Sequence, residues 1–545
     1  MNLKFIHFII IFIFFNCNSF IIANCCAIKS KTSCDKFTDL NYNKTFFSIR
    51  PQDSNSARDL LKRVSSAYMY GDCLFGGVFN CIFEYQRSFN SKDLGRWFLF
   101  NGTNCATVGI SGDSEVFDVD GRQVGITTPH QEPGAIGQFC INPNIENFIF
   151  DFDFYFDSSK LCNRLWFDFD FIVAYARTNL DFCQTYSSGS GLVYPAGFDD
   201  LNCNTTDIPY DSILCALIGD KGFGAIPPLN CGKFSSKDLA TGGLAAIHLD
   251  VGYDFCRTDE SNFSASARVV FPTGNKPKAE YLFDPVIGPN GCWQVGATIN
   301  AHDLIYGRNC DGNQVRFYLD AIFTHLFARE QNRLFNLNNN GPGSQYLLLK
   351  KFAPGEDIIG LDVIGAERVA NVLCGQAKIG SDFMFDGSFM LNFSNTCNGF
   401  FGNLGYNLWV RSKEKIKDGV CFKNFSELQY GIKGIQPLST TIEFDICPNQ
   451  DQICCVTDKT TASESTLSQP APADSTTIFL TESDINFEAP LHPLAISNKI
   501  FGSIGHFWKC YQHPTYLLIG AEVEFGVDKK ALSQWGVLID FAINF

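Results

Sequence analysis

The sequence predicts an all-β fold, a closed antiparallel transmembrane β-barrel of about 12 strands with long external loops. Three observations predict it. Long segments alternate apolar with small or polar side chains, as strands with two different faces do. The connections between these segments alternate between short and long. The chain begins with an export signal, and no other stretch approaches the roughly 18 apolar residues of a spanning helix.

Residues 1–23 have the pattern of a signal peptide. Lys4 precedes a nearly unbroken apolar run at 8–15, and Ala23 offers a small residue for cleavage. Removing Cys17 with the signal leaves 22 of the 23 cysteines, an even number that suits disulfides in an oxidising compartment. No Cys-x-x-Cys pair accompanies them, so we expect neither a metal nor another cofactor.

Residues 24–140 are interpreted as an N-terminal periplasmic or plug-like segment that includes room for a first strand, expected within 76–118. A short helix is expected at 53–68, with Leu60, Leu61 and Val64 apolar. Residues 141–545 are assigned to the barrel.

Period-two alternation justifies each barrel strand in turn. At 147–157 phenylalanine alternates with Ile, Asp and Tyr, and at 535–545 every odd position is apolar. The predicted strands start near Asn147, Arg164, Ala245, Phe263, Trp293, Val315, Ala377, Leu404, Ile500, Thr515 and Trp535. Bacterial barrels have an even number of strands, so a twelfth is expected upstream.

The connections give an independent indication. The short ones lie near 158–163, 256–262, 303–313, 394–398 and 510–514, and the long ones near 177–243, 272–291, 328–375 and 412–497. Short turns are periplasmic and long loops external in bacterial barrels, which places the C-terminus in the periplasm. The long loops hold many cysteines, so disulfide-braced loops are expected, although the sequence does not give their pairing.

The polar faces of the strands are mostly acidic. We predict that they line a lumen formed by Asp151, Asp153, Asp168, Asp170, Asp250, Asp254, Arg268, Arg316, Asp320, Asp382, Asp386, Glu522, Glu524 and Asp540. Charged rings tune the selectivity of pores, so an open lumen of this kind would prefer cations. His248 and His302 fall on the same faces, where a polar lumen explains them better than catalysis does.

Four phrases carry a resemblance to a known group of proteins: FFSIRP at 46–51, RVVFPTGNKPKAEYLFDP at 268–285, NGPGSQYLLLKKF at 340–352 and ALSQWG at 531–536. They resemble uncharacterised, porin-like outer-membrane β-barrel proteins of host-associated Gram-negative bacteria. The terminal Phe545 is similar to the aromatic residue that ends such barrels as an assembly signal. The resemblance implies an outer-membrane location, with lipid and the barrel-assembly machinery as partners through the C-terminal strand. It assigns no activity.

Motifs of catalysis are absent, including Gly-x-Ser-x-Gly, a phosphate-binding loop and His-Glu-x-x-His, so we do not expect an enzyme. No nucleic-acid partner is expected. The predicted function is a porin-like channel for small solutes with an acidic, cation-preferring lumen. Two alternatives stay open. One is a surface structural protein or adhesin that presents disulfide-braced loops to a host surface. The other is a secreted soluble cysteine-rich β-protein, because a soluble sandwich also alternates.

Overall fold

A computed structural model describes the chain at 44–69, 76–99, 102–110, 117–126, 134–158, 164–186, 193–194, 199–201, 204, 206–258, 260–307, 312–338, 343–352, 363–422, 425, 429–433, 479–508 and 513–545. The predicted signal peptide lies outside these residues. All described residues belong to one compact unit, Tyr42–Phe545. Within them, no helix combines the length and the hydropathy that crossing a membrane requires.

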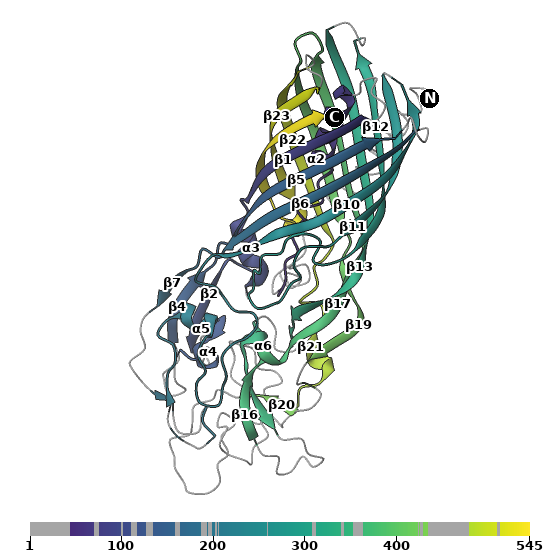
Figure 1. Cartoon of the computed structure of the whole chain (residues 1–545). Coiled ribbons are helices and arrows are strands. Elements are labelled where there is room, and N and C mark those ends of the chain that lie inside the picture. Colours follow the sequence, from purple (N-terminus) through teal and green to yellow (C-terminus); the bar gives the residue numbers. More distant parts are fainter. Residues whose placement is uncertain are drawn as a thin grey trace, which may run out of the picture. The chain divides into compact units, whose positions relative to one another are not determined.

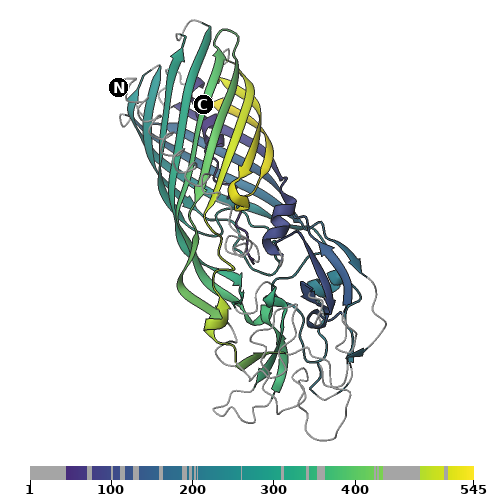
Figure 2. The same ribbon diagram turned by 180° about the vertical axis from the view of Figure 1, so that it is seen from behind.

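Twelve strands form a closed antiparallel barrel, as predicted (Figures 1 and 2). They are β1 (Gly76–Ser88), β5 (Asn144–Asp157), β6 (Leu165–Asn179), β10 (Leu239–Arg257), β11 (Ser261–Phe271), β12 (Gln294–Tyr306), β13 (Asn313–Leu334), β17 (Cys374–Asn395), β18 (Phe400–Arg411), β22 (Ala495–Trp508), β23 (Thr515–Gly526) and β24 (Gln534–Asn544). Each pairs with its neighbours along the chain, and β1 pairs with β24 to close the ring. The expected twelfth strand is therefore β1.

Alternation along each strand separates an apolar outer face from a polar inner face. In β24, Val537 and Ile539 are 44% and 46% exposed, whereas Asp540 between Ile539 and Phe541 is 0% exposed. Successive side chains of a strand point to opposite faces, so the apolar stripe faces outward. We call the outward aromatic and aliphatic side chains of the barrel strands the apolar belt; it includes Phe150, Val251, Phe323, Ile500, Ile519 and Phe541.

The long connections, together with the one between β1 and β5, fold into a loop assembly with a hydrophobic core of its own. Its elements are α3 (Ser91–Phe98), β2 (Cys105–Ile110), β3 (Val119–Asp120), α4 (Gly121–Val124), β4 (Gly134–Cys140), β7 (Cys183–Tyr186), β8 (Val193–Tyr194), β9 (Thr206–Asp207), α5 (Ile213–Ile218), β14 (Asn336–Leu337), η1 (Ser344–Tyr346), β15 (Leu348–Phe352), β16 (Val363–Arg368), α6 (Val369–Val372), β19 (Glu414–Phe422), β20 (Gln429–Ile432), η2 (Glu482–Asp484) and β21 (Ile485–Asn486). A further single turn, η3 (Val527–Lys529), connects β23 to β24.

Two disulfides between described residues brace this assembly. Cys105–Cys140 joins β2 to β4, which are neighbours in one small sheet. Cys231–Cys374 joins the connection after β6 to the start of β17, across a sequence separation of 143 residues. A bond across so long a loop restricts the unfolded chain strongly. The expectation of disulfide-braced loops is thus supported at these two pairs.

Of the chain before β1, the structure describes residues 44–69, which lead into the barrel. The helix expected at 53–68 is α2 (Ser56–Met69), and it packs against β1, β13, β17, β18 and β24 (Figure 1). Its apolar residues Leu60, Leu61 and Val64 join a buried cluster with Trp166 and Tyr516 of the barrel wall. We call residues 44–69 the plug, because they occupy the lumen that the sequence predicted.

Candidate functional site in the barrel lumen

Thirteen of the fourteen residues predicted to line the lumen point into the barrel. Each of them is at most 9% exposed: Asp151, Asp153, Asp168, Asp170, Asp250, Asp254, Arg268, Arg316, Asp320, Asp386, Glu522, Glu524 and Asp540. The alternation of the strands positions them, because each has outward apolar neighbours on its own strand. His248 also points inward, and its side chain is 4% exposed.

Asp382 is a correction to the prediction. The pairing of β13 with β17 shifts register twice, between Thr324 and Leu326 and again before Arg329. Such a bulge exchanges the two faces of a strand. Asp382 is therefore partly exposed on the outer side, where it pairs with Lys415 and Lys417 of β19.

Arg50 anchors the plug to the wall near the start of α2. Its guanidinium lies 2.7 Å from a carboxylate oxygen of Asp386 on β17 and 3.0 Å from one of Glu524 on β23. Asp386 also accepts a hydrogen bond of 3.2 Å from the backbone N–H of Ser56, the first residue of α2. A carboxylate at this end of a helix satisfies a free N–H and stabilises the helix dipole. The wall therefore fixes both the position and the start of the helix.

Arg58 and Lys62 make the densest set of ion pairs, on one face of α2. Arg58 lies 3.0 Å from Glu84 on β1 and 2.7 Å from Asp151 on β5. Lys62 lies 2.9 Å from Asp151 and also binds Asp170 on β6. Residues four apart on a helix share a face, which lets both cations reach the same wall.

Charges of the other sign also connect the plug to the wall. Asp59 of α2 pairs with Arg268 on β11 at 3.3 Å, and Asp53 lies 3.3 Å from His248 Nε2 on β10. Arg63 pairs with Asp320 on β13 at 3.2 Å. The plug thus carries both cations and carboxylates that pair with groups of the opposite charge on the wall.

Charge compensation explains why this acidic interior can be dry. Burying an unpaired carboxylate is costly, and a buried pair is tolerated only with good geometry and further hydrogen bonds. Glu84 and Asp250 show this: both are 0% exposed, and they pair with Arg58 and Arg268. The lumen is therefore closed at the level of these groups while the plug is in place.

The cations of the plug were not among the residues predicted to line the lumen: Arg50, Arg58, Lys62 and Arg63. A signal was present: a short helix with basic residues at 58, 62 and 63 precedes strands whose inner faces are acidic. The prediction also left out Lys499 on β22, which pairs with Glu522 at 2.6 Å. Lys499 belongs to a strand whose alternation of apolar and polar residues is irregular, so the sequence did not show that its side chain points inward.

Phe545 completes the seam of the barrel. Its backbone N–H and C=O exchange hydrogen bonds of 3.0 and 3.1 Å with Gly77 at the start of β1. A Cβ atom on Gly77 would lie 2.5 Å from the Phe545 ring, so a larger residue there would displace the ring from its present position. The ring also contacts Phe156 at a centroid distance of 5.8 Å. The predicted assembly signal thus lies where the last strand meets the first.

No protein-family model matches this chain, and no curated protein matches it. Solved structures that resemble it include an outer-membrane channel from Pseudomonas putida F1, at 10% identity and a TM-score of 0.32 over 91% of this chain and 100% of that chain. The translocator domain of the autotransporter NalP from Neisseria meningitidis matches at 6% identity and a TM-score of 0.26, over 90% and 95% of the two chains. A FadL homologue from Pseudomonas aeruginosa matches at 8% identity and a TM-score of 0.25, over 86% and 90%. At these scores the likeness assigns no cargo to this chain.

Proposed function

We propose that this protein is a porin-like outer-membrane channel for small solutes whose resting state is closed by its own plug. The observation that carries the proposal is the set of ion pairs that joins the plug to the inner wall of a closed barrel. The protein transports solutes and catalyses no reaction. Its partners are the solute, the lipid around the belt and the machinery that assembles such barrels.

The apolar belt supports the membrane location. Monomeric soluble proteins rarely expose contiguous apolar patches larger than a few hundred Å². Here Val537, Ile539 and Phe541 follow one another on one strand, and Ile519 and Val523 lie on the next, all at least 38% exposed. Lipid is the surrounding that stabilises such a face, with the backbone hydrogen bonds satisfied inside the ring.

The charges of the wall support a preference for cations once the plug has left. In the closed state, Arg50, Arg58 and Lys62 of the plug compensate Asp386, Glu524, Glu84, Asp151 and Asp170 of the wall. An open lumen loses these cations and keeps the carboxylates. Water and mobile cations then take the place of the plug.

A reversible crosslink between plug and wall tests the gate. The hydroxyl oxygens of Ser56 on α2 and Ser388 on β17 lie 2.6 Å apart. Two sulfur atoms at these positions are close to bonding distance. We expect the S56C/S388C variant to be silent in planar lipid bilayers when oxidised and to open like the wild type after reduction. Each single variant, S56C and S388C, serves as the control that cannot lock.

Equal conductance of the oxidised and reduced double variant would exclude the plug as the gate. The absence of any openings in the wild type and in the reduced variant would exclude a channel.

Selectivity is read from the reversal potential in a salt gradient. The D153N/D168N/D540N variant keeps the ion-pair partners of Arg50, Arg58 and Lys62, and it should shift this potential away from cation preference. An unchanged potential would remove the proposed role of the acidic lumen.

A second candidate function is a surface adhesin, favoured by the loop assembly with its own core and its two disulfides. In that case the barrel is only an anchor, and no treatment of the plug yields conductance. The crosslinking experiment therefore separates the two functions.

A further inference from the structure

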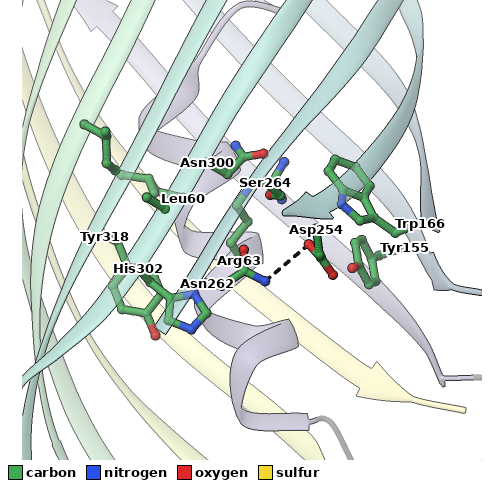
Figure 3. A pocket seen from close by; sticks show the side chains of 12 residues that line it. Leu60, Arg63, Tyr155, Trp166, Asp254, Asn262, Ser264, Asn300, His302 and Tyr318 are labelled. Carbon is green, nitrogen blue, oxygen red and sulfur yellow. Dashed lines mark hydrogen bonds between the residues drawn. The ribbon is translucent and has the colours of Figure 1, made fainter. Parts of the chain in front are cut away.

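A small cavity of about 50 Å³ lies between α2 and the strands from β5 to β13 (Figure 3). The side chains that define it are Arg63, Trp166, Asn262, Ser264, His302 and Tyr318. The side chain of Arg63 is 19% exposed, so solvent reaches the cavity. Unlike the sealed ion pairs around Arg58, this part of the lumen has room for a guest.

Several lining groups have hydrogen-bonding capacity that the protein does not use. Asn262 and His302 are direct neighbours on β11 and β12, and Ser264 follows Asn262 on the same face. Asn262 donates its amide N–H to Asp254 at 3.2 Å, and its side-chain carbonyl oxygen accepts no hydrogen bond from the described residues. Within the described part of the chain, the Ser264 hydroxyl and the His302 ring have no hydrogen-bond partner. Donors and acceptors therefore face the same space.

The charges at the cavity compensate one another inside the protein. Arg63 pairs with Asp320 at 3.2 Å, and Asp254 lies 3.4 Å from Arg257. A charged guest would add an uncompensated charge to a largely buried site, which is costly. The site therefore favours a neutral guest that can both donate and accept hydrogen bonds.

Aromatic rings supply the apolar walls. Tyr155 and Trp166 lie with ring centroids 5.7 Å apart and planes inclined by 32°, and His302 and Tyr318 lie 5.4 Å apart at 36°. A Cβ atom on Gly252 would lie 2.0 Å from the indole of Trp166, so glycine at this position lets the indole lie flat on β10. Rings of this kind pack against the C–H groups of a solute while polar groups fix its orientation.

We propose that this cavity binds a small neutral polyol, of the size of glycerol, or one end of a larger sugar. A water molecule needs about 10–15 Å³ of such volume, so the cavity holds about three to five waters. Bonded atoms pack more closely than separate waters, so a guest of the size of glycerol is close to the largest that fits. The inference deepens the proposed function, on which it rests, by naming the class of solute that the lumen recognises.

Saturation-transfer NMR on the full-length protein in a detergent without a sugar headgroup tests this site. Glycerol is the probe, and glycine, inorganic phosphate and toluene represent zwitterions, anions and apolar solutes. We expect a saturable signal with glycerol, and at least tenfold weaker binding in the S264A/H302A variant. That variant leaves no hydrogen-bonding group of the described residues unpaired, because neither side chain bonds to one of them. The matched control is S503A, on the opposite part of the wall, where the hydroxyl accepts a hydrogen bond from Asn403.

A glycerol signal that does not saturate, or that persists unchanged in S264A/H302A, would overturn the site. Saturable binding of glycine, phosphate or toluene that the same variant abolishes would overturn the class of ligand. The measurement needs no open pore. A negative crosslinking experiment therefore does not contradict glycerol binding at this cavity. The absence of glycerol binding likewise does not contradict gating by the plug.

Discussion

Arg58 illustrates how single residues hold the lumen closed. Its side chain is 1% exposed, and the carboxylates of Glu84 and Asp151 both lie within 3.0 Å. Replacing a whole buried ion pair by apolar groups is often neutral, but removing one partner leaves a buried charge uncompensated. Arg58 therefore contributes to stability mainly by compensating the charges of these two buried carboxylates.

The R58A variant tests this contribution to stability. We expect it to lower the free energy of unfolding by about 3–5 kcal/mol, because it leaves Glu84 and Asp151 without their guanidinium. The matched control is R87A, which removes an exposed arginine 3.5 Å from Glu146 and should change stability by less than about 1 kcal/mol. Urea unfolding of the lipid-embedded protein measures both. An equal effect of the two variants would contradict the assignment.

His492 predicts a pH dependence outside the barrel strands. Its ring stacks on Trp97 with centroids 5.2 Å apart, and burial, followed by Arg411, holds its pKa well below the ordinary 6.5. Below pH 6.5 the unfolded chain takes up a proton that the folded protein does not, so stability falls as the pH falls. It is unaffected by this residue at higher pH.

The H492F variant keeps a ring at this position and removes the titration. We expect the wild type to lose up to about 1.4 kcal/mol per pH unit more than H492F between pH 6 and pH 5. Urea midpoints at several pH values measure the difference. H513Q, a substitution of an exposed histidine, should retain the slope of the wild type. Parallel pH profiles of the wild type and H492F would disprove the prediction.

At the scale of elements, strands were predictable wherever alternation is long. All eleven predicted strands and α2 are present, with starts within six residues of the expected ones, because a period of two or 3.6 repeats many times in each. Asp382 was misplaced because a bulge changes the direction of side chains without a mark in the sequence. The strands of the loop assembly, such as β2 and β15, span only 5–6 residues and pair with distant segments.

The candidate site was only half predictable for a related reason. Alternation along the strands predicted which carboxylates point into the barrel, because the direction of a side chain is a local property of its strand. It could not show that Arg58 and Lys62 meet them, because those contacts join segments that are distant in the chain. The cavity near Trp166 likewise needs α2 and six strands in place before it exists.

The belt is tested at β24 with a charged substitution. We expect V537R to cost up to about 2–4 kcal/mol in lipid, because an arginine on the lipid-facing side of a barrel strand loses its hydration. I364R is the matched control, because Ile364 in β16 of the loop assembly has the same exposure of 44%. It should change stability by less than about 0.5 kcal/mol. Equal and small effects of both variants would indicate that water surrounds the belt.

At the scale of the whole molecule, the plug and the barrel pack together as one compact unit. The plug contacts the long-connection end of the barrel through Ser48 and Arg411. The first strand begins at the opposite end, where Gly76 pairs with Asp157. The plug therefore extends along the lumen, and the barrel that β1 and β24 close surrounds it. The outer face of the barrel is apolar, and many charged groups inside it are paired. We therefore expect the barrel to resist unfolding in a membrane.

The most direct test of this account is the electrophoretic mobility of the protein in the outer-membrane fraction, unboiled against boiled, with and without reductant. We predict that the protein is found in that fraction and that the unboiled band migrates faster than the boiled one, because the closed barrel resists the detergent until it is heated. Reductant should leave this shift in place, since the ring is closed by strand pairing rather than by disulfides. A soluble product whose mobility does not change on boiling would contradict the transmembrane barrel and leave a secreted β-protein.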